Sequence, residues 1–320
     1  MIVLFYTLLL KIAPLYMNIL LGFAAGKLLG TPRDVLGRLM FYMINPIIMF
    51  NGILYTKIDA GVLSLPVLIF VVSCSLCLLF YFLASYIWKD STRNLAAFSA
   101  GSGNTGYFGL PLVLMLLDKQ GEGVYMMAMM GISLYENSLG FYICAKGTHT
   151  PRECALKLFK LPTVYAFLVA LTLNVIGTPI PVVFQDFICH IKGTFVVLGM
   201  MIIGVGLAGL TSFKLDFKFV GLTFLAKFVV WPTIILGVIA LDMHFLHLFS
   251  RDIYDALILL SIVPLAVNTV VLASVLHAQP EKAAVTVMLG TLFALLYVPF
   301  MVITFMPEAA ATFGRLFCTL

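Results

Sequence analysis

Small and polar residues interrupt an apolar stretch near residue 100 and place hydrogen-bonding groups in a segment otherwise suited to lipid. Asn104, Thr105 and Gly106 lie at its centre, and Pro111 follows. Glycine and proline weaken a helix, and lipid cannot satisfy the backbone groups that lose their partners. We expect a second half-helix to begin near Gly106 with four free N–H groups and a positive dipole end. Such an end binds anions, whereas a packing kink without a ligand is the alternative.

A second interruption lies in the other half of the chain, where Pro264 is followed by Asn268 and Thr269. Proline removes one N–H and leaves a carbonyl of the preceding turn without its helical partner. A lone proline is often only a bend, but two interrupted spans at corresponding places are typical of secondary transporters with inverted repeats. We therefore expect two broken helices to cross and to form a substrate site from Asn104, Thr105, Gly106, Pro111, Pro264, Asn268 and Thr269.

Three charged residues, Glu136, Lys227 and Lys11, lie well inside predicted spans, where charge is costly and is a functional hypothesis by default. Glu136 and Lys227 either form a buried pair or line a cavity in which Glu136 carries a coupling proton. A helix-packing ion pair, or a side chain that reaches the membrane interface, is the alternative, and it is favoured for Lys11. Asn45 and Asn51, in a proline-kinked span, either line the cavity or only shape helix packing.

The sequence offers no pattern for catalysis or metal binding. We find no nucleophile triad, no phosphate-binding loop and no metal-ligand spacing, so we expect no metal, no cofactor and no enzyme activity. No nucleic-acid motif is present, and basic residues in a membrane protein mark topology more than acidic partners. A proton remains the candidate coupling ion.

The composition is that of an all-α polytopic membrane protein. The chain is 62% hydrophobic and 10% charged, with a mean hydropathy of +1.11, whereas soluble domains are about half apolar and about a quarter charged. A transmembrane helix needs about 20 apolar residues. Ten segments meet that test: 2–29, 35–56, 61–88, 94–117, 122–145, 160–178, 193–210, 217–241, 253–276 and 283–306.

The distribution of basic residues predicts the orientation. The odd-numbered connections hold twelve Lys and Arg residues against five on the other side, and basic loops stay in the cytoplasm. Both termini are then expected outside the cytoplasm. Five spans per half make the repeats inverted, which divides the chain into a first five-helix repeat, 1–145, a short cytoplasmic linker, 146–159, and a second five-helix repeat, 160–320.

The stretch Asn104-Thr-Gly-Tyr-Phe-Gly-Leu-Pro111-Leu resembles the fourth-span motif of the auxin efflux carrier family, which includes plant auxin exporters and bacterial permeases for malate and malonate. Weaker similarities around Pro46, Leu161-Pro162 and Val263-Pro264 extend the resemblance over nearly the whole chain. The resemblance implies ten spans with broken helices 4 and 9 crossed, in the fold of the sodium-coupled bile acid transporters. It also implies a scaffold of spans 1, 2, 6 and 7, a transport unit of spans 3–5 and 8–10 that moves as an elevator, and a homodimer through the scaffold.

Residue by residue, the resemblance implies that Asn104 holds a substrate carboxylate and that Pro111 and Pro264 are the crossover prolines. The chain departs from the plant members because the long loop between spans 5 and 6 is missing and span 3 has no acid–lysine pair between Gly61 and Trp88. Auxin itself is therefore not the expected substrate. Sodium coupling is less expected than proton coupling, because Asp255 is the only acid in the two broken spans.

We therefore expect a secondary transporter of small organic anions, mono- or dicarboxylates, in the lipid bilayer of a bacterial inner membrane. One rival is an uncoupled channel or facilitator, which would show steady flux without saturation. A second rival is a membrane sensor on the same scaffold, which would bind its ligand without moving it. An intramembrane enzyme is disfavoured by the absence of paired catalytic acids.

Overall fold

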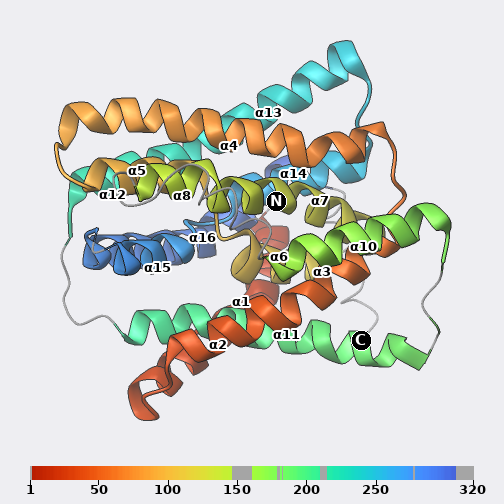
Figure 1. Ribbon diagram of the computed structural model, residues 1–320, viewed down its shortest axis with the longest axis horizontal. Helices are drawn as coiled ribbons and strands as arrows, with labels where there is room; N and C mark the ends of the chain where they lie inside the picture. The colour runs from red at the N-terminus through yellow and green to blue at the C-terminus, as the bar shows by residue number, and fades with distance from the viewer. Residues whose placement is uncertain are drawn as a thin grey trace.

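The computed structural model describes residues 2–145, 161–178, 181, 183–209, 215–276 and 278–307, and within these residues the chain is helical without a strand. The expected linker, 146–159, lies outside the described residues. In Figure 1, α4 and α13 lie along the upper side and α2 and α11 along the lower side, with α5, α8, α15 and α16 among the helices between them. The chain is an all-helical polytopic membrane protein.

A helix or a pair of helices lies over each of the ten expected segments. Six continuous segments within the described residues are long and apolar enough to cross a membrane. The others are interrupted or shorter, so the count of ten spans stays a prediction. The elements are α1 (Ile2–Leu28), α2 (Arg33–Leu39), η1 (Met40–Ile44), α3 (Asn45–Leu54), α4 (Ala60–Ile87), α5 (Thr92–Gly101), η2 (Thr105–Gly109), α6 (Leu110–Leu116), α7 (Lys119–Asn137), α8 (Leu139–Cys144), α10 (Pro162–Ile176), α11 (Val183–Ala208), α12 (Phe217–Phe224), η3 (Leu225–Val230), α13 (Trp231–Leu241), η4 (Asp242–Leu246), α14 (Arg251–Ile262), α15 (Asn268–Val275) and α16 (Pro280–Phe305).

The predicted start of the seventh segment was wrong. We expected the helix to begin at residue 193, whereas α11 begins at Val183. Asp186, His190 and Lys192 favour a loop by composition. Lys192 instead forms an ion pair with Glu122 of α7, so the helix continues where the hydropathy pattern ends.

Three of the π-helical turns have a shared cause in the sequence. Pro46, Pro111 and Pro232 each stand second in the helix that directly follows such a turn. Proline lacks an N–H, and its ring clashes with the carbonyl of the fourth residue before it, so the turn before a proline widens. In η2 the wider turn is closed by a bond of 2.9 Å from the Gly109 amide to the Asn104 carbonyl.

Glycine allows α1 and α11 to pack backbone against backbone. A Cβ on Gly204 would lie 1.9 Å from the Ile19 carbonyl oxygen, and one on Gly22 would lie 2.1 Å from the Met201 carbonyl oxygen. Small residues at such a contact let membrane helices approach closely. Elsewhere α10 packs on α3, while α4 packs on α5 and α7. The division into scaffold and transport unit stays a prediction.

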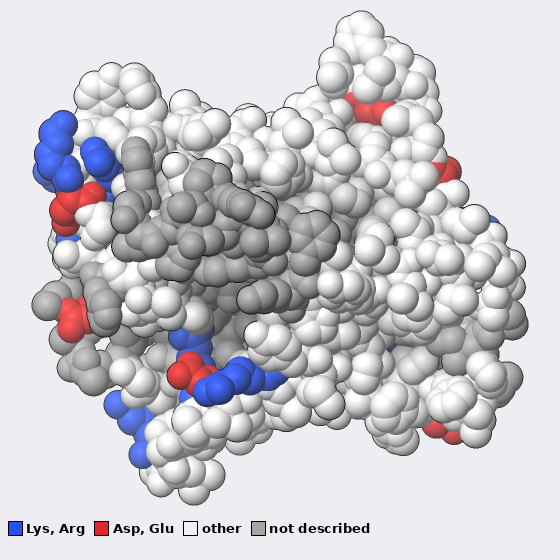
Figure 2. All heavy atoms as spheres, in the orientation of Figure 1, with Lys and Arg blue, Asp and Glu red and all other residues white. Residues whose placement is uncertain are grey.

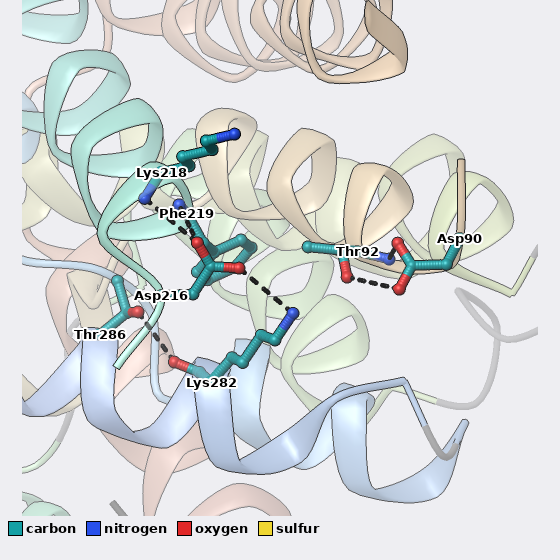
Figure 3. Close-up of polar contacts among 7 residues, drawn as sticks. All are labelled: Asp90, Thr92, Asp216, Lys218, Phe219, Lys282 and Thr286. Atoms are coloured by element: carbon teal, nitrogen blue, oxygen red, sulfur yellow. Dashed lines mark hydrogen bonds and ion pairs between the residues drawn. The ribbon is translucent and has the colours of Figure 1, made fainter. Parts of the chain in front are cut away.

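Basic side chains gather at one end of the molecule. Figure 2 shows most of the visible Lys and Arg residues in the left half, which in Figure 1 holds the beginnings of α5 and α12, whereas the right half shows mainly acidic residues. At this basic end, Asp216 accepts hydrogen bonds of 3.1 Å from the amides of Lys218 and Phe219 and pairs with Lys282 at 3.2 Å (Figure 3). Asp216 therefore both caps α12 and ties it to α16.

Candidate functional site

Two interrupted helices meet in the interior of the molecule. Helix α5 ends at Gly101 and η2 begins at Thr105, while α14 ends at Ile262 and α15 begins at Asn268. The backbone amide of Asn104 donates a hydrogen bond of 2.9 Å to the carbonyl of Pro264. The two breaks predicted from the sequence therefore contact each other directly.

The hydrogen bonds at the first break change one sequence expectation. Four free N–H groups were expected at the start of the second half-helix, yet the Asn104 amide bonds the Pro264 carbonyl and the Thr105 amide bonds the Gly103 carbonyl. Fewer backbone amides are therefore open to a ligand than the sequence indicates. The side chain of Asn104 becomes correspondingly more important as a donor.

Aromatic side chains with polar tips satisfy the backbone carbonyls that the first break leaves open. The Tyr135 hydroxyl donates to the Phe98 carbonyl at 3.0 Å, and the Trp231 indole donates to the Ala100 carbonyl at 2.7 Å. The Tyr125 hydroxyl donates to the Thr105 carbonyl at 3.0 Å. These donors explain how a broken helix stays buried without loss of hydrogen bonding.

The carbonyl of Val267, in the second break, accepts a hydrogen bond from a cation in addition to the one from the Val270 amide. The Arg33 guanidinium, at the start of α2, donates to it at 3.2 Å. From the sequence, Arg33 was used only as one of the basic residues that predict membrane orientation. Tyr135 and Trp231 were not predicted as site residues. A Tyr or Trp inside an apolar span indicates a side chain that can donate to a freed backbone carbonyl. The spacing alone does not say which carbonyl it reaches.

Buried polar atoms without a hydrogen-bond partner gather around the crossing. Such atoms are rare in folded proteins, and each costs about 1–3 kcal/mol when it stays unpaired. Asn104 is only 4% exposed, and its side-chain nitrogen is one of them. Within the described part of the chain the group at the crossing comprises Ser102 Oγ, Asn104 Nδ2, Glu136 Oε1, Lys227 Nζ and Thr269 Oγ1.

A cavity of about 340 Å³ lies beside these atoms. It extends from the crossing toward the basic end, where Phe141 of α8, Leu161 before α10 and Val275 of α15 line it. Its polar wall carries amides and hydroxyls, and no Lys or Arg is among the described lining residues. The wall includes Asn45, Asn104, Thr105, Tyr107, Ser133, Glu136, Asn137, Thr163 and Asn268.

The predicted site residues divide into two groups around this cavity. Asn45, Asn104, Thr105, Gly106, Glu136 and Asn268 line it. Pro111, Pro264, Thr269, Lys227 and Asn51 do not appear among its lining residues. Pro111 shapes η2, and Pro264 supplies the carbonyl that Asn104 contacts. For Asn51 a place in the cavity wall was one expectation, and its absence from the wall leaves the alternative role in helix packing.

Glu136 and Lys227 approach the crossing from different helices. The Asn268 amide donates to Glu136 Oε2 at 2.7 Å. Lys227 is fully buried, and its ammonium lies 4.7 Å from the centre of the Trp231 ring. A Cβ on Gly103 would lie 2.5 Å from Lys227 Nζ, so glycine leaves the space that the ammonium fills. The two charges interact electrostatically, but no ion pair joins them among those found within the described residues.

Contacts near the start of α7 join it to α11 and to the segment that follows α3. Glu122 of α7 pairs with Lys192 of α11. The Gln120 side chain accepts from the Lys57 amide at 2.7 Å and donates to the Lys57 carbonyl at 3.2 Å. We call Glu122, Lys192, Gln120 and Lys57 the outer contact. None of these four residues lines the cavity.

Comparison with known proteins agrees with this geometry. Residues 149–302 match the model of a family described as membrane transport protein, and the match includes both halves of the second broken helix. No curated protein matches the chain. Within the described residues, no group of three or more His, Cys, Asp or Glu side chains is placed to hold a metal ion.

Proposed function

The chain belongs to the membrane transport protein family that contains the auxin efflux carriers, and from this premise we propose that it is a secondary transporter of small organic anions. Mono- and dicarboxylates are the proposed substrate class. The observation that carries the proposal is the cavity at the crossing of two broken helices, with unpaired polar atoms around it. Discontinuous helices at mid-membrane are the usual binding elements of such transporters.

The chemistry of the crossing supports a carboxylate ligand. Asn104 Nδ2 is a buried donor without a partner, and Thr105 stands beside it in the cavity wall. A carboxylate oxygen bound to Asn104 would remove the cost of that unpaired donor, and hydrogen bonds to a charged acceptor are stronger than neutral ones. A volume of about 340 Å³ suits a small acid.

The position of the cavity supports alternating access. Its lining reaches Val275 at the end of α15, on the side where α5 and α12 begin (Figure 1), whereas no residue of the outer contact lines it. Basic loops stay in the cytoplasm, so this arrangement corresponds to an inward-open state with both termini outside. In the proposed elevator, spans 3–5 and 8–10 move against spans 1, 2, 6 and 7, and breaking the outer contact accompanies that motion.

The setting of the protein is proposed from the resemblance to bacterial permeases and from the absence of the long loop found in plant members. We place the chain in a bacterial inner membrane, as a homodimer through the scaffold. Cross-linking of cysteines placed on exposed positions of α1, such as Leu10 at 72% and Leu20 at 67% exposure, tests the dimer in membranes. No cross-link at any α1 position would contradict that arrangement.

A thermal-shift screen of the detergent-solubilised protein against small carboxylates tests the proposed site. A ligand at about 100 times its dissociation constant should stabilise the folded state by about 2.7 kcal/mol. We expect one acid class to raise the melting temperature of the wild type and of Asn51→Ala, but not of Asn104→Ala. Asn51→Ala is the matched control, because it removes the same group from a position outside the cavity.

The outcomes of the screen separate the site from the substrate class. A shift that persists in Asn104→Ala would overturn the proposed site. No shift with any carboxylate would overturn the substrate class.

A further inference from the structure

The cavity carries an unusual charge for a site that takes an anion. Glu136 is the one charged residue among its described lining residues. A carboxylate substrate would therefore come close to another carboxylate, in a region where the dielectric constant is low and like charges repel strongly. The site must remove the charge of Glu136, or balance it, before an anion is stable there.

The two carboxylate oxygens of Glu136 have different surroundings. Oε2 accepts the 2.7 Å hydrogen bond from Asn268, which itself lines the cavity. Oε1 is covered by protein and has no partner at hydrogen-bond geometry, although the Ser102 hydroxyl interacts with the carboxyl group. Glu136 therefore stands at the boundary between the cavity and the protein interior.

Lys227 supplies a positive charge behind this wall. Its side chain is 0% exposed, Nζ has no hydrogen-bond partner, and the ammonium is packed against Gly103 of the first break. The aromatic face of Trp231 provides a cation–π contact at 4.7 Å. Lys227 and Glu136 interact electrostatically across the crossing without a direct ion pair.

The net charge of the site can be followed through a transport cycle. With Glu136 ionised and Lys227 protonated, the empty site is neutral. A bound monoanion adds one negative charge, and a proton on the Glu136 carboxylate removes one, so the loaded site is neutral again. Moving an uncompensated charge through the membrane is costly, which favours neutrality in both states.

We propose that the Glu136–Lys227 couple binds one proton together with each monoanionic substrate, so that the transport unit crosses the membrane without net charge whether loaded or empty. This inference rests on the proposed function and names its coupling ion. The proton binds the Glu136 carboxylate on the side where the anion enters and leaves with the anion on the other side. Lys227 keeps its proton throughout the cycle. Its positive charge balances the Glu136 carboxylate in the empty site and the substrate anion in the loaded site.

The other titratable groups around Glu136 do not replace it in this role. Tyr107 of η2 and Tyr135 of its own helix interact with it electrostatically. Arg33 of α2 acts on Tyr107, while Cys74 and Cys77 of α4 act on Tyr135. Tyrosine and cysteine are ordinarily uncharged, and arginine ordinarily charged, near pH 7. Glu136 therefore differs from all of these neighbours, and Lys227 is the one other group described at the crossing whose charge could change.

Trp231 provides a readout that needs no substrate. The chain has two tryptophans, so Trp88→Phe leaves Trp231 as the only indole fluorophore. We expect its emission to change with pH in a one-proton transition, because the charge of Glu136 acts on the Lys227 ammonium that lies over the ring. Glu136→Gln should remove this transition, whereas Asp186→Asn, which alters an exposed acid in the first turn of α11, should leave it in place. An emission that does not change with pH, or a transition that persists in Glu136→Gln, would overturn the proton site.

Proteoliposome transport then tests the coupling. With a transported monocarboxylate and an entrapped pH indicator, we expect one proton per anion and an uptake rate that does not respond to an imposed membrane potential. Glu136→Gln should still exchange labelled for unlabelled anion but should lose net uptake, since its empty site carries a positive charge. Lys227→Arg should retain coupling better than Lys227→Met, because it keeps the charge.

Two transport results would overturn the proton coupling, namely anion uptake without proton movement and net uptake by Glu136→Gln at the wild-type rate. Absence of any carboxylate transport by the wild type would instead overturn the proposed function. The fluorescence titration of Trp231 would still decide whether the proton site exists, so the two failures are distinguishable.

Discussion

The backbone amide of Asn104 donates a 2.9 Å hydrogen bond to the carbonyl oxygen of Pro264. This contact joins the interrupted helix of the first half to that of the second. It also fixes the backbone from which the Asn104 side chain reaches the cavity. The crossing is therefore a defined junction, and its geometry depends on both breaks.

Restoring the second helix should disturb this junction. Pro264→Ala returns the missing N–H and lets α14 continue into the break, which would move the carbonyl that Asn104 contacts. We expect transport to fall at least about tenfold, equivalent to about 1.4 kcal/mol, while the protein still folds. Pro299→Ala, in the unbroken helix α16, is the control and should retain most transport. Equal rates for both variants would contradict a role for the break.

Weakening the outer contact should favour an outward-open state. Glu122→Gln keeps the shape of the side chain but removes the charge that pairs with Lys192. If the pair contributes about 1 kcal/mol, the population open to the outside rises about fivefold. The rate at which an impermeant thiol reagent labels Thr56→Cys, a position 2% exposed beside α7, measures this in a cysteine-free background. Asp34→Asn at the other end is the control, and unchanged labelling in Glu122→Gln would contradict the assignment.

The close contact of α1 with α11 should tolerate no side chain at Gly204. A Cβ there would lie 1.9 Å from the Ile19 carbonyl, and backbone atoms cannot move aside cheaply. We expect Gly204→Ala to lower stability by about 1–3 kcal/mol through overpacking, measured as thermal unfolding in detergent. Gly237→Ala adds the same methyl group in α13, where nothing lies within 4 Å, and it should not destabilise. A stable Gly204→Ala would show that the helices separate easily.

The cap of α12 should make stability depend on pH at the basic end. Burial acts to raise the pKa of Asp216, but hydrogen bonds from the Phe219 amide and from Lys282 outweigh it and hold the pKa below its ordinary value. Its stabilisation is therefore present above the unfolded pKa of about 3.9 and is lost as the pH falls through the lower folded value.

Asp216→Asn should accordingly destabilise by about 1 kcal/mol at pH 7 and hardly at all once the wild-type carboxyl is protonated. A double-mutant cycle with Lys282→Met isolates the ion pair at 3.2 Å. A cost for Asp216→Asn that stays the same at both pH values would show that the carboxylate charge does not contribute.

Hydropathy and helix-breaking residues were enough to place most of the helices, though not the start of α11. The breaks at Asn104 and Pro264 were located within a few residues, because glycine, proline and polar side chains rarely gather inside an apolar run unless the helix is broken there. The start of α11 was missed because the ion pair that holds Lys192 in a helix comes from α7. A contact between distant segments leaves no local pattern.

The candidate site was predictable only in part for the same reason. Asn104, Glu136 and Asn268 were identified as polar residues in apolar spans, and all three line the cavity. The spacing does not reveal that Trp231 bonds the Ala100 carbonyl, because that depends on how the two helices are rotated. Nor does it reveal that Lys227 stands behind Gly103 instead of pairing directly with Glu136.

Counterflow in proteoliposomes tests the central claim most directly. Vesicles loaded with an unlabelled small carboxylate and placed in a trace of the labelled acid should accumulate label transiently when wild-type protein is present. Asn51→Ala should behave like the wild type, whereas Asn104→Ala should lose the overshoot, with kcat/KM reduced about tenfold or more. Equal counterflow in Asn104→Ala, or unsaturable flux without counterflow in the wild type, would contradict a carrier that binds its substrate at the crossing.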